Sequence, residues 1–229
     1  MTAFEDALKA LRSRWEHVMV PDLARIRELM DLLGSPQRAY PAVHLTGTNG
    51  KTSTARMIDA LLRAHGLRTG RYTSPHLEHV TERVCLDGEP VTEERFGEVW
   101  ADIAPYVGMV DAHHPERVTF FELTTAMAFA AFADAPVDVA VVEVGLGGEW
   151  DATNVLDAGV CAITTIDLDH TALLGTTVAA IAAEKAGIVH EGATVITALQ
   201  PPGALEVLTR RAVEVGATIA RICRPSWLR

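Results

Sequence analysis

The sequence predicts an α/β fold with a doubly wound, mostly parallel sheet, and three observations lead to this prediction. Apolar segments of strand length alternate along the chain with segments of helical periodicity. The segments 138–148 and 158–170 are almost continuously apolar, which is typical of strands buried on both faces of a parallel sheet. Three polar clusters follow strand segments, and ligands of such sheets bind at the carboxyl ends of the strands.

The expected elements can be placed in chain order. The first is a helix over 22–34, because Leu23, Ile26, Met30 and Leu33 have helical spacing and Gly34 ends the pattern. The others are a strand at 42–46, a helix at 52–66, a strand at 68–74, a hairpin within 81–92 that turns at Asp87-Gly88, a helix at about 93–106, a helix at 119–135, the strands 138–148 and 158–170, a helix at 177–189, a strand at 193–198 and a helix at 202–216.

Composition excludes several classes of protein. The chain has 229 residues, of which 48% are apolar and 22% charged, as in ordinary soluble globular proteins. A net charge of −10 argues against a broad nucleic-acid surface, although a local cationic pocket for a small anionic substrate is compatible with it. The apolar runs are too short to span a bilayer, and the N-terminus has no apolar signal core, so we expect a cytoplasmic protein without a membrane partner. Cys85, Cys161 and Cys223 form no CxxC pair, which supports neither a disulfide framework nor a zinc site.

The first polar cluster, Gly47-Thr48-Asn49-Gly50-Lys51-Thr52, is a glycine-rich turn between a strand and a helix. It is shorter than a Walker loop, since Leu45 occupies the position of the first Walker glycine. Backbone N–H groups in such a turn cradle phosphate oxygens, a lysine reaches the β- and γ-phosphates, and a threonine hydroxyl can join a Mg2+ shell. The sequence therefore predicts a phosphate site here, against the alternative of a plain glycine turn with an exposed lysine.

The other two clusters leave alternatives open when taken alone. Glu143 ends an apolar strand segment, where a metal ion or a buried salt bridge would offset its charge. Asp151 and Asn154 are either site residues or turn formers. His170 is the last residue of the segment 158–170, and a lone histidine is more often a hydrogen-bonded residue than a ligand. Lys185 lies in an apolar helical segment, where a lysine commonly extends to the surface.

Taken together, these stretches resemble the central ATPase domain of the Mur ligase superfamily, and within it the folate branch of dihydrofolate and folylpolyglutamate synthases. The resemblance rests on "GTNGKTST" (47–54), "YTSPHLEHVTERV" (72–84), "VEVGLGGEWDATNV" (142–155), "DHTALLG" (169–175) and "EKAGI" (184–188), in the family's order. By this resemblance, the short loop is that superfamily's ATP site, and Leu45 in place of the first Walker glycine is compatible with ATP binding.

The resemblance implies an ATP-dependent ligase. ATP would phosphorylate the carboxylate of dihydropteroate or a reduced folate, and the amino group of L-glutamate would attack the acyl phosphate to form an amide. By the same resemblance, residues 47–52 hold the triphosphate, and Lys51, Lys185 and His170 are the catalytic residues. Thr52, Ser74 and Glu143 hold Mg2+, and His170 holds a second ion together with Lys185, which the family carries as a carbamate. Arg83, Phe121, Asp151 and Asn154 fall in segments that resemble the pterin-binding wall, where Arg83 would help to order a loop.

The resemblance also has departures. Thr52 stands where the folate branch often has glycine, and Glu149 occupies a position that is often basic. Family members carry a C-terminal domain that presents glutamate. We expect this chain to lack it and to consist of a central ATP-binding domain at 1–220, with a helical lead-in at 1–40 and an atypical tail at 221–229. A separate C-terminal domain is therefore a possible partner.

The sequence is compatible to different degrees with three other functions. The chain could be a nucleotide-binding module without turnover that needs its other domain. A cell-wall Mur ligase is disfavoured, because "SPHLEHVTERV" and "GGEWDATN" look like folate-branch segments. A P-loop GTPase is least favoured, since the chain has no NKxD segment for guanine.

Overall fold

An eight-stranded sheet forms the centre of the molecule in the computed structural model, which describes residues 2–14 and 21–221. Its strand order is β4-β3-β2-β5-β1-β6-β7-β8, and the run from β2 to β8 is parallel. β3 and β4 are antiparallel and lie at one edge. The strands are β1 (Ala42–Thr46), β2 (Thr69–Tyr72), β3 (Val84–Leu86), β4 (Glu89–Pro90), β5 (Val139–Glu143), β6 (Val160–Ile163), β7 (Thr194–Thr197) and β8 (Thr218–Arg221). The predicted α/β fold with a mostly parallel sheet is confirmed.

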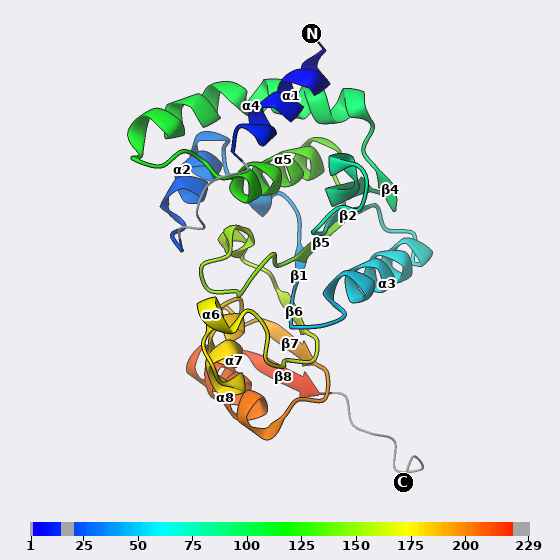
Figure 1. Cartoon of the computed structure of the whole chain (residues 1–229). Coiled ribbons are helices and arrows are strands. Elements are labelled where there is room, and N and C mark those ends of the chain that lie inside the picture. Colours follow the sequence, from blue (N-terminus) through cyan, green and yellow to red (C-terminus); the bar gives the residue numbers. More distant parts are fainter. Residues whose placement is uncertain (1, 15–20, 222–229) are drawn as a thin grey trace.

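Helices cover both faces of this sheet. They are α1 (Ala3–Arg12), α2 (Ala24–Leu32), α3 (Lys51–Ala64), α4 (Glu93–His113), α5 (Phe120–Asp134), α6 (Thr171–Leu174), α7 (Val178–Ala186) and α8 (Pro202–Glu214), with 3-10 turns at Pro36–Arg38, Val80–Arg83 and Ala152–Val155. Figure 1 shows α5, α4 and α1 layered at one end of the molecule and α7 and α8 beside β7 and β8 at the other.

The alternation of side chains along β1 separates the two faces. Leu45 and its neighbours Val141 and Ala162 pack under α3 with Ala55. His44, one residue earlier, pairs with Val142 and Cys161, which belong to the clusters packed against α5 and α7 respectively. Between α5 and α7, the segment 145–156 covers this second face.

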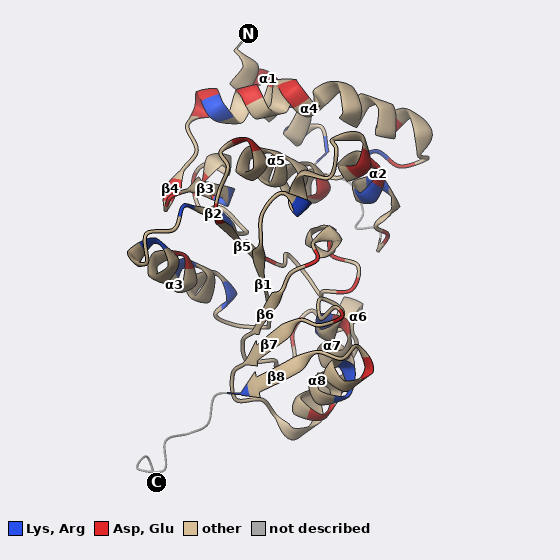
Figure 2. Cartoon of the chain, turned by 180° about the vertical axis from the view of Figure 1, so that it is seen from behind, with Lys and Arg blue, Asp and Glu red and all other residues tan. Residues whose placement is uncertain are grey.

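The surface carries charges of both signs. Figure 2 shows acidic and basic residues interspersed on the outer helices, while the strands at the centre of the sheet are largely uncharged. Cys85 and Cys161 are buried and unpaired, and Cys223 lies outside the described residues. None of the helices in the described ranges has the length and apolar character needed to cross a membrane.

Most predicted elements are present, with differences at their ends. The strand at 42–46 is β1, and the hairpin turns at Asp87 and Gly88, which have φ of 50° and 89°. The predicted strands 138–148 and 158–170 end earlier, at Glu143 and Ile163, because the glycines and polar residues beyond them form loops of the site. The atypical tail lies outside the described residues except for Arg221, the last residue of β8.

The helix expected at 93–106 continues to His113 through Pro105. A proline removes one helical hydrogen bond and crowds the preceding turn. The helix continues because Ile103, Val107 and Val110 recur at helical spacing on both sides of the proline and are all buried in the core. β8 and the one-turn α6 were not predicted.

Candidate functional site

The three polar clusters meet at one edge of the sheet. They follow β1, β5 and β6, which are adjacent strands in the order β5-β1-β6. Hydrogen bonds join the loops directly, since Thr48 N–H donates to Thr165 O over 3.0 Å and Thr46 Oγ1 donates to Gly147 O over 3.0 Å. The expectation that ligand-type residues converge at the carboxyl ends of these strands is confirmed.

The loop after β1 is shaped to receive an anion. Gly50 precedes α3 with φ of 80°, and no side chain caps the first backbone N–H groups of this helix. Lys51 Nζ donates to Gly47 O over 3.1 Å and to Thr48 O over 3.3 Å, so the lysine lies across its own loop. A Cβ atom at Gly47, where φ is 145°, would collide with the Thr164 side chain, so glycine is favoured at this position. Free N–H groups and an adjacent ammonium are the donors that bind phosphate.

Glu143, at the end of β5, places a carboxylate beside this loop. Its side chain is buried, and Thr52 Oγ1 lies 2.9 Å from each of its oxygens, while Ser74 N–H donates to Oε2 over 3.3 Å. Burial raises the pKa of this carboxyl, against the hydrogen bonds from Thr52 and Ser74 and the charge of Lys51. Within the described part of the chain, no lysine or arginine forms an ion pair with Glu143.

Lys185 is a buried cation on α7. Its side chain has neither a hydrogen bond nor an ion pair with other described residues, and the residue is only 4% exposed. Burial is the main reason that the pKa of Lys185 falls to about 8, and the charge of Lys51 lowers it further, while Asp169, Asp151 and Glu184 raise it. About a tenth of this amine is therefore neutral and nucleophilic at pH 7, far more than of an ordinary lysine.

His170 stands at the start of α6 in a left-handed conformation with φ of 47°, and its Nε2 lies 3.6 Å from Asp169 Oδ2. Among the described residues, no group of three or more His, Cys, Asp or Glu side chains is arranged to hold a metal ion. Hydroxyl groups, a ligand or a modified lysine would have to complete a metal shell here.

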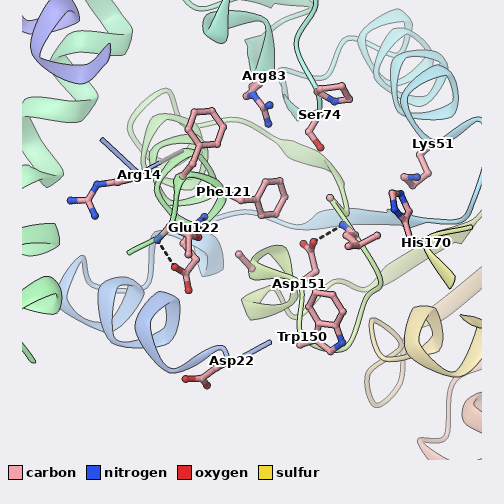
Figure 3. Close-up of a pocket in the computed structure, with 16 residues that line it drawn as sticks. Arg14, Asp22, Lys51, Ser74, Arg83, Phe121, Glu122, Trp150, Asp151 and His170 are labelled. Atoms are coloured by element: carbon pink, nitrogen blue, oxygen red, sulfur yellow. Dashed lines mark hydrogen bonds between the residues drawn. The ribbon is translucent and has the colours of Figure 1, made fainter. Parts of the chain in front are cut away.

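A cavity of about 550 Å³ lies next to the phosphate loop. Figure 3 shows Phe121 in its middle, Arg83 and Ser74 on one side, Asp151 and Trp150 on the opposite side, and Lys51 with His170 at one end. Its lining consists of Arg14, Asp22, Lys51, Ser74, Pro75, Arg83, Thr119, Phe120, Phe121, Glu122, Gly145, Leu146, Trp150, Asp151, Ala152 and His170. The cavity thus joins aromatic walls to a cationic end.

Three of the predicted substrate-binding residues line this cavity, and the fourth does not. Arg83, Phe121 and Asp151 are part of the wall, whereas Asn154 lies behind it. The Asn154 amide donates to Glu149 O over 3.0 Å and to Gly187 O over 3.2 Å, and its Oδ1 lies 3.0 Å from His190 Nε2. Asn154 thereby fastens the segment 145–156 to the end of α7.

The segment 74–83 carries Arg83 into the cavity. Arg83 Nε donates to His76 Nδ1 over 2.8 Å, and the guanidinium lies 5.0 Å from the centre of the Phe120 ring. The Glu82 carboxylate accepts hydrogen bonds from the backbone N–H groups of residues 77, 78 and 79, which lower its pKa to about 2. These contacts hold Arg83 at the rim without a ligand.

Several residues that line the cavity are not among the predicted site residues, for example Arg14, Asp22, Glu122 and Trp150. Glu122 had a usable signal, because Thr119-Phe-Phe-Glu122 is a capping-box pattern and the structure contains the box. The buried Glu122 carboxylate also pairs with Arg25 over 3.1 Å. Arg14 and Asp22 are far from every motif in sequence, and no local pattern identifies them.

Comparison with known proteins gives a consistent result. The family model "Mur ligase middle domain" matches residues 45–213. The dihydrofolate synthase/folylpolyglutamate synthase of Mycobacterium tuberculosis is 48% identical in an alignment of length 225 that covers 92% of this chain and 46% of that protein.

Two solved structures are similar throughout the chain. The M. tuberculosis folylpolyglutamate synthase complexed with ADP superposes with a TM-score of 0.90 at 48% identity, covering 96% of this chain and 50% of the other. An FPGS–AMPPCP–folate complex superposes with a TM-score of 0.92 at 36% identity, covering 98% and 55%. The chain therefore spans about half the length of the relatives that it matches.

Proposed function

The chain belongs to the Mur ligase family, and from this premise we propose that it binds ATP and a folate-type carboxylic acid for ligation to L-glutamate. One observation carries the proposal: the phosphate loop, the Glu143 carboxylate and an aromatic-walled cavity meet at the carboxyl ends of adjacent strands. The names of the relatives support the same substrates, since they are folylpolyglutamate synthases in complexes with ADP or with AMPPCP and folate.

In this proposal, residues 47–52 bind the triphosphate. The unoccupied N–H groups at the start of α3 face the β- and γ-phosphates, and the ammonium of Lys51 exchanges its backbone carbonyls for phosphate oxygens. The buried position of Gly47 against Thr164 keeps the loop backbone close to the sheet, so that the phosphates approach β1 and β5.

Mg2+ fits the donors next to this loop. Glu143 is a buried carboxylate without a cationic partner in the described structure, and the hydroxyls of Thr52 and Ser74 complete a set of oxygen donors. Lys185, once carbamylated, and His170 would hold a second ion. When bound, Mg2+ would neutralise charge on the phosphates and on the attacking carboxylate.

The cavity receives the acceptor. A flat pteridine ring fits against Phe121 and Trp150, and its N–H groups match Asp151. The carboxylate at the other end of the acceptor would lie towards Lys51 and His170, beside the γ-phosphate. Dihydropteroate and reduced folates both have this combination of a planar ring and a distal carboxylate.

The reaction then takes place in two transfers. A carboxylate oxygen of the acceptor attacks the γ-phosphorus, the bond to the β–γ bridging oxygen breaks, and ADP leaves. The glutamate amino nitrogen attacks the acyl carbon, the bond to the phosphate oxygen breaks, inorganic phosphate leaves, and the amine loses a proton. The protein contributes position and charge neutralisation more than covalent chemistry.

The test is an assay of the chain 1–229 with ATP, Mg2+, L-glutamate and dihydropteroate, in which dihydrofolate is detected by mass. Product that disappears with Lys51→Ala supports ligation by this chain. Binding of ATP and dihydropteroate without product supports the first half of the reaction and the need for a further domain. A chain that binds neither ligand would refute the proposal.

A further inference from the structure

His44 is a fully buried histidine that the proposed reaction does not use. It lies in β1 between β5 and β6, on the face of the sheet under the segment 145–156. Its Nε2 is 2.8 Å from Thr153 Oγ1. Thr46, two residues along the same face, donates to Gly147 O in the same segment. Both polar side chains on this face of the central strand therefore support the cavity wall.

The direction of the hydrogen bonds follows from the chemistry of Asp151. Burial raises the pKa of Asp151, but hydrogen bonds from the Thr153 side chain and from backbone N–H groups oppose this and favour the ionised form. An ionised carboxylate only accepts, so Thr153 Oγ1 donates to Asp151 Oδ1. A hydroxyl has a single proton, so Thr153 Oγ1 must accept from His44 Nε2–H. The connected groups His44, Thr153 and Asp151 therefore form one directed relay that ends on the carboxylate.

The other nitrogen of His44 agrees with this direction. Nδ1 is buried and has no hydrogen-bond partner in the described structure, which is tolerable for a lone pair and costly for an N–H group. Burial, together with the charge of His190, lowers the pKa of His44 to about 3, so the ring is neutral with its proton on Nε2.

The relay supplies one of three hydrogen bonds that orient the Asp151 carboxylate. Oδ1 accepts from both Thr153 N–H and Thr153 Oγ1, and Oδ2 accepts from Leu146 N–H over 2.9 Å. Figure 3 shows this carboxylate below Phe121, within the cavity. These contacts hold the carboxylate in the rotamer that faces the cavity, where it can accept from a ligand N–H.

We infer that His44 is a positioning residue for the acceptor site, which acts through Thr153 on Asp151 and so sets the affinity for an acceptor that presents N–H groups. This inference rests on the proposed function, because it assumes that the cavity binds the acceptor. It predicts that the affinities for the two ligands respond differently, since none of the hydrogen bonds in the described structure joins the relay to the phosphate loop.

The test measures dissociation constants of dihydropteroate and of ATP with Mg2+ for the chain 1–229, by calorimetry. His44→Leu and Thr153→Val each remove a donor, and we expect roughly tenfold weaker dihydropteroate binding. ATP affinity should stay within about twofold, because ATP contacts are separate. His44→Gln and Thr153→Ser restore a donor and should recover most of the affinity. The double variant His44→Leu/Thr153→Val should be no weaker than about the weaker single variant. Nitrogen-15 NMR of the wild-type imidazole should show the Nε2–H tautomer.

Three results would overturn the inference. Variants that bind dihydropteroate as the wild type does would show that the relay has no influence on the acceptor. Equal losses for both ligands, not recovered by His44→Gln, would indicate general loosening of the structure. A wild-type chain that binds ATP but no dihydropteroate would refute the acceptor assignment as well, and this outcome separates failure of the proposed function from failure of the relay alone.

Discussion

The segments that follow β1 and β5 are neighbours in space but differ in how their polar groups are used. In the phosphate loop, Asn49 and Gly50 are exposed, and the first N–H groups of α3 have no side-chain cap. In the segment after β5, residues 151–154 are all buried, and Asp151 and Asn154 make their hydrogen bonds within the protein. The phosphate loop is therefore prepared for a ligand at little cost to folding, whereas the cavity wall is part of the core. Substitutions in the phosphate loop should therefore change ligand affinity alone, whereas substitutions in the cavity wall should also change the free energy of unfolding.

The largest effect is expected at Lys51. Lys51→Ala removes a charge-assisted donor to phosphate and should weaken ATP binding by roughly 10- to 150-fold. The free energy of unfolding should change little, because the ammonium contacts only carbonyls of its own loop. Calorimetric titration and urea denaturation measure the two quantities. Lys9→Ala, at an exposed lysine on α1, is the matched control, and an equal loss of ATP affinity in that variant would contradict the role of Lys51.

Asp151→Asn should affect both stability and binding. The amide is nearly isosteric, but its NH2 group must face a donor, either Leu146 N–H or the two donors of Thr153. We expect a loss of about 1–3 kcal/mol in the free energy of unfolding, as for a broken buried network. Dihydropteroate binding should weaken in parallel. If the Asp151→Asn variant unfolded in urea at the same free energy as the wild type, this wall would not be part of the core.

Asn154→Ala distinguishes support of the wall from contact with the ligand. The substitution removes hydrogen bonds to Glu149 O, Gly187 O and His190, which should cost about 1.5 kcal/mol of unfolding free energy. Dihydropteroate affinity, measured well below the unfolding transition, should be retained, because Asn154 does not line the cavity. If Asn154→Ala were stable but bound dihydropteroate much more weakly, Asn154 would contact the substrate, as the family resemblance implies.

The pH dependence of stability provides the smallest and most specific test. The folded state lowers the pKa of His44 from 6.5 to about 3, so between these values the unfolded chain binds the additional proton. The contribution of neutral His44 to the free energy of unfolding is fully present above pH 6.5, and it is lost as the pH decreases through this window. Relative to His44→Gln, the wild type should lose about 1 kcal/mol between pH 7 and pH 5.5. Urea denaturation of both proteins at each pH isolates this contribution, and parallel curves would mean that His44 titrates normally.

The sequence predicted the sheet and the meeting of the three clusters, because strand periodicity and glycine loops are local signals. β1 and the Asp87-Gly88 turn were placed correctly for that reason. The predicted end of α4 at about residue 106 was too early, since buried residues on both sides of Pro105 extend the helix to His113. The relay from His44 to Asp151 depends on a contact across 109 positions in sequence between His44 and Thr153, and no local pattern contains it.

The two anchors on β1 have a consequence for how this architecture can vary in length. His44 reaches Thr153 and Thr46 reaches Gly147, and a strand advances about 3.3 Å per residue, so these anchor points stand roughly 7 Å apart. Inserting or deleting one residue within β1 would turn Leu45 towards the wall and both polar side chains towards α3. The length of β1 therefore fixes the position of the cavity wall relative to the phosphate loop. Insertions and deletions are tolerable in the outer connections, whereas β1 tolerates substitutions but no change of length.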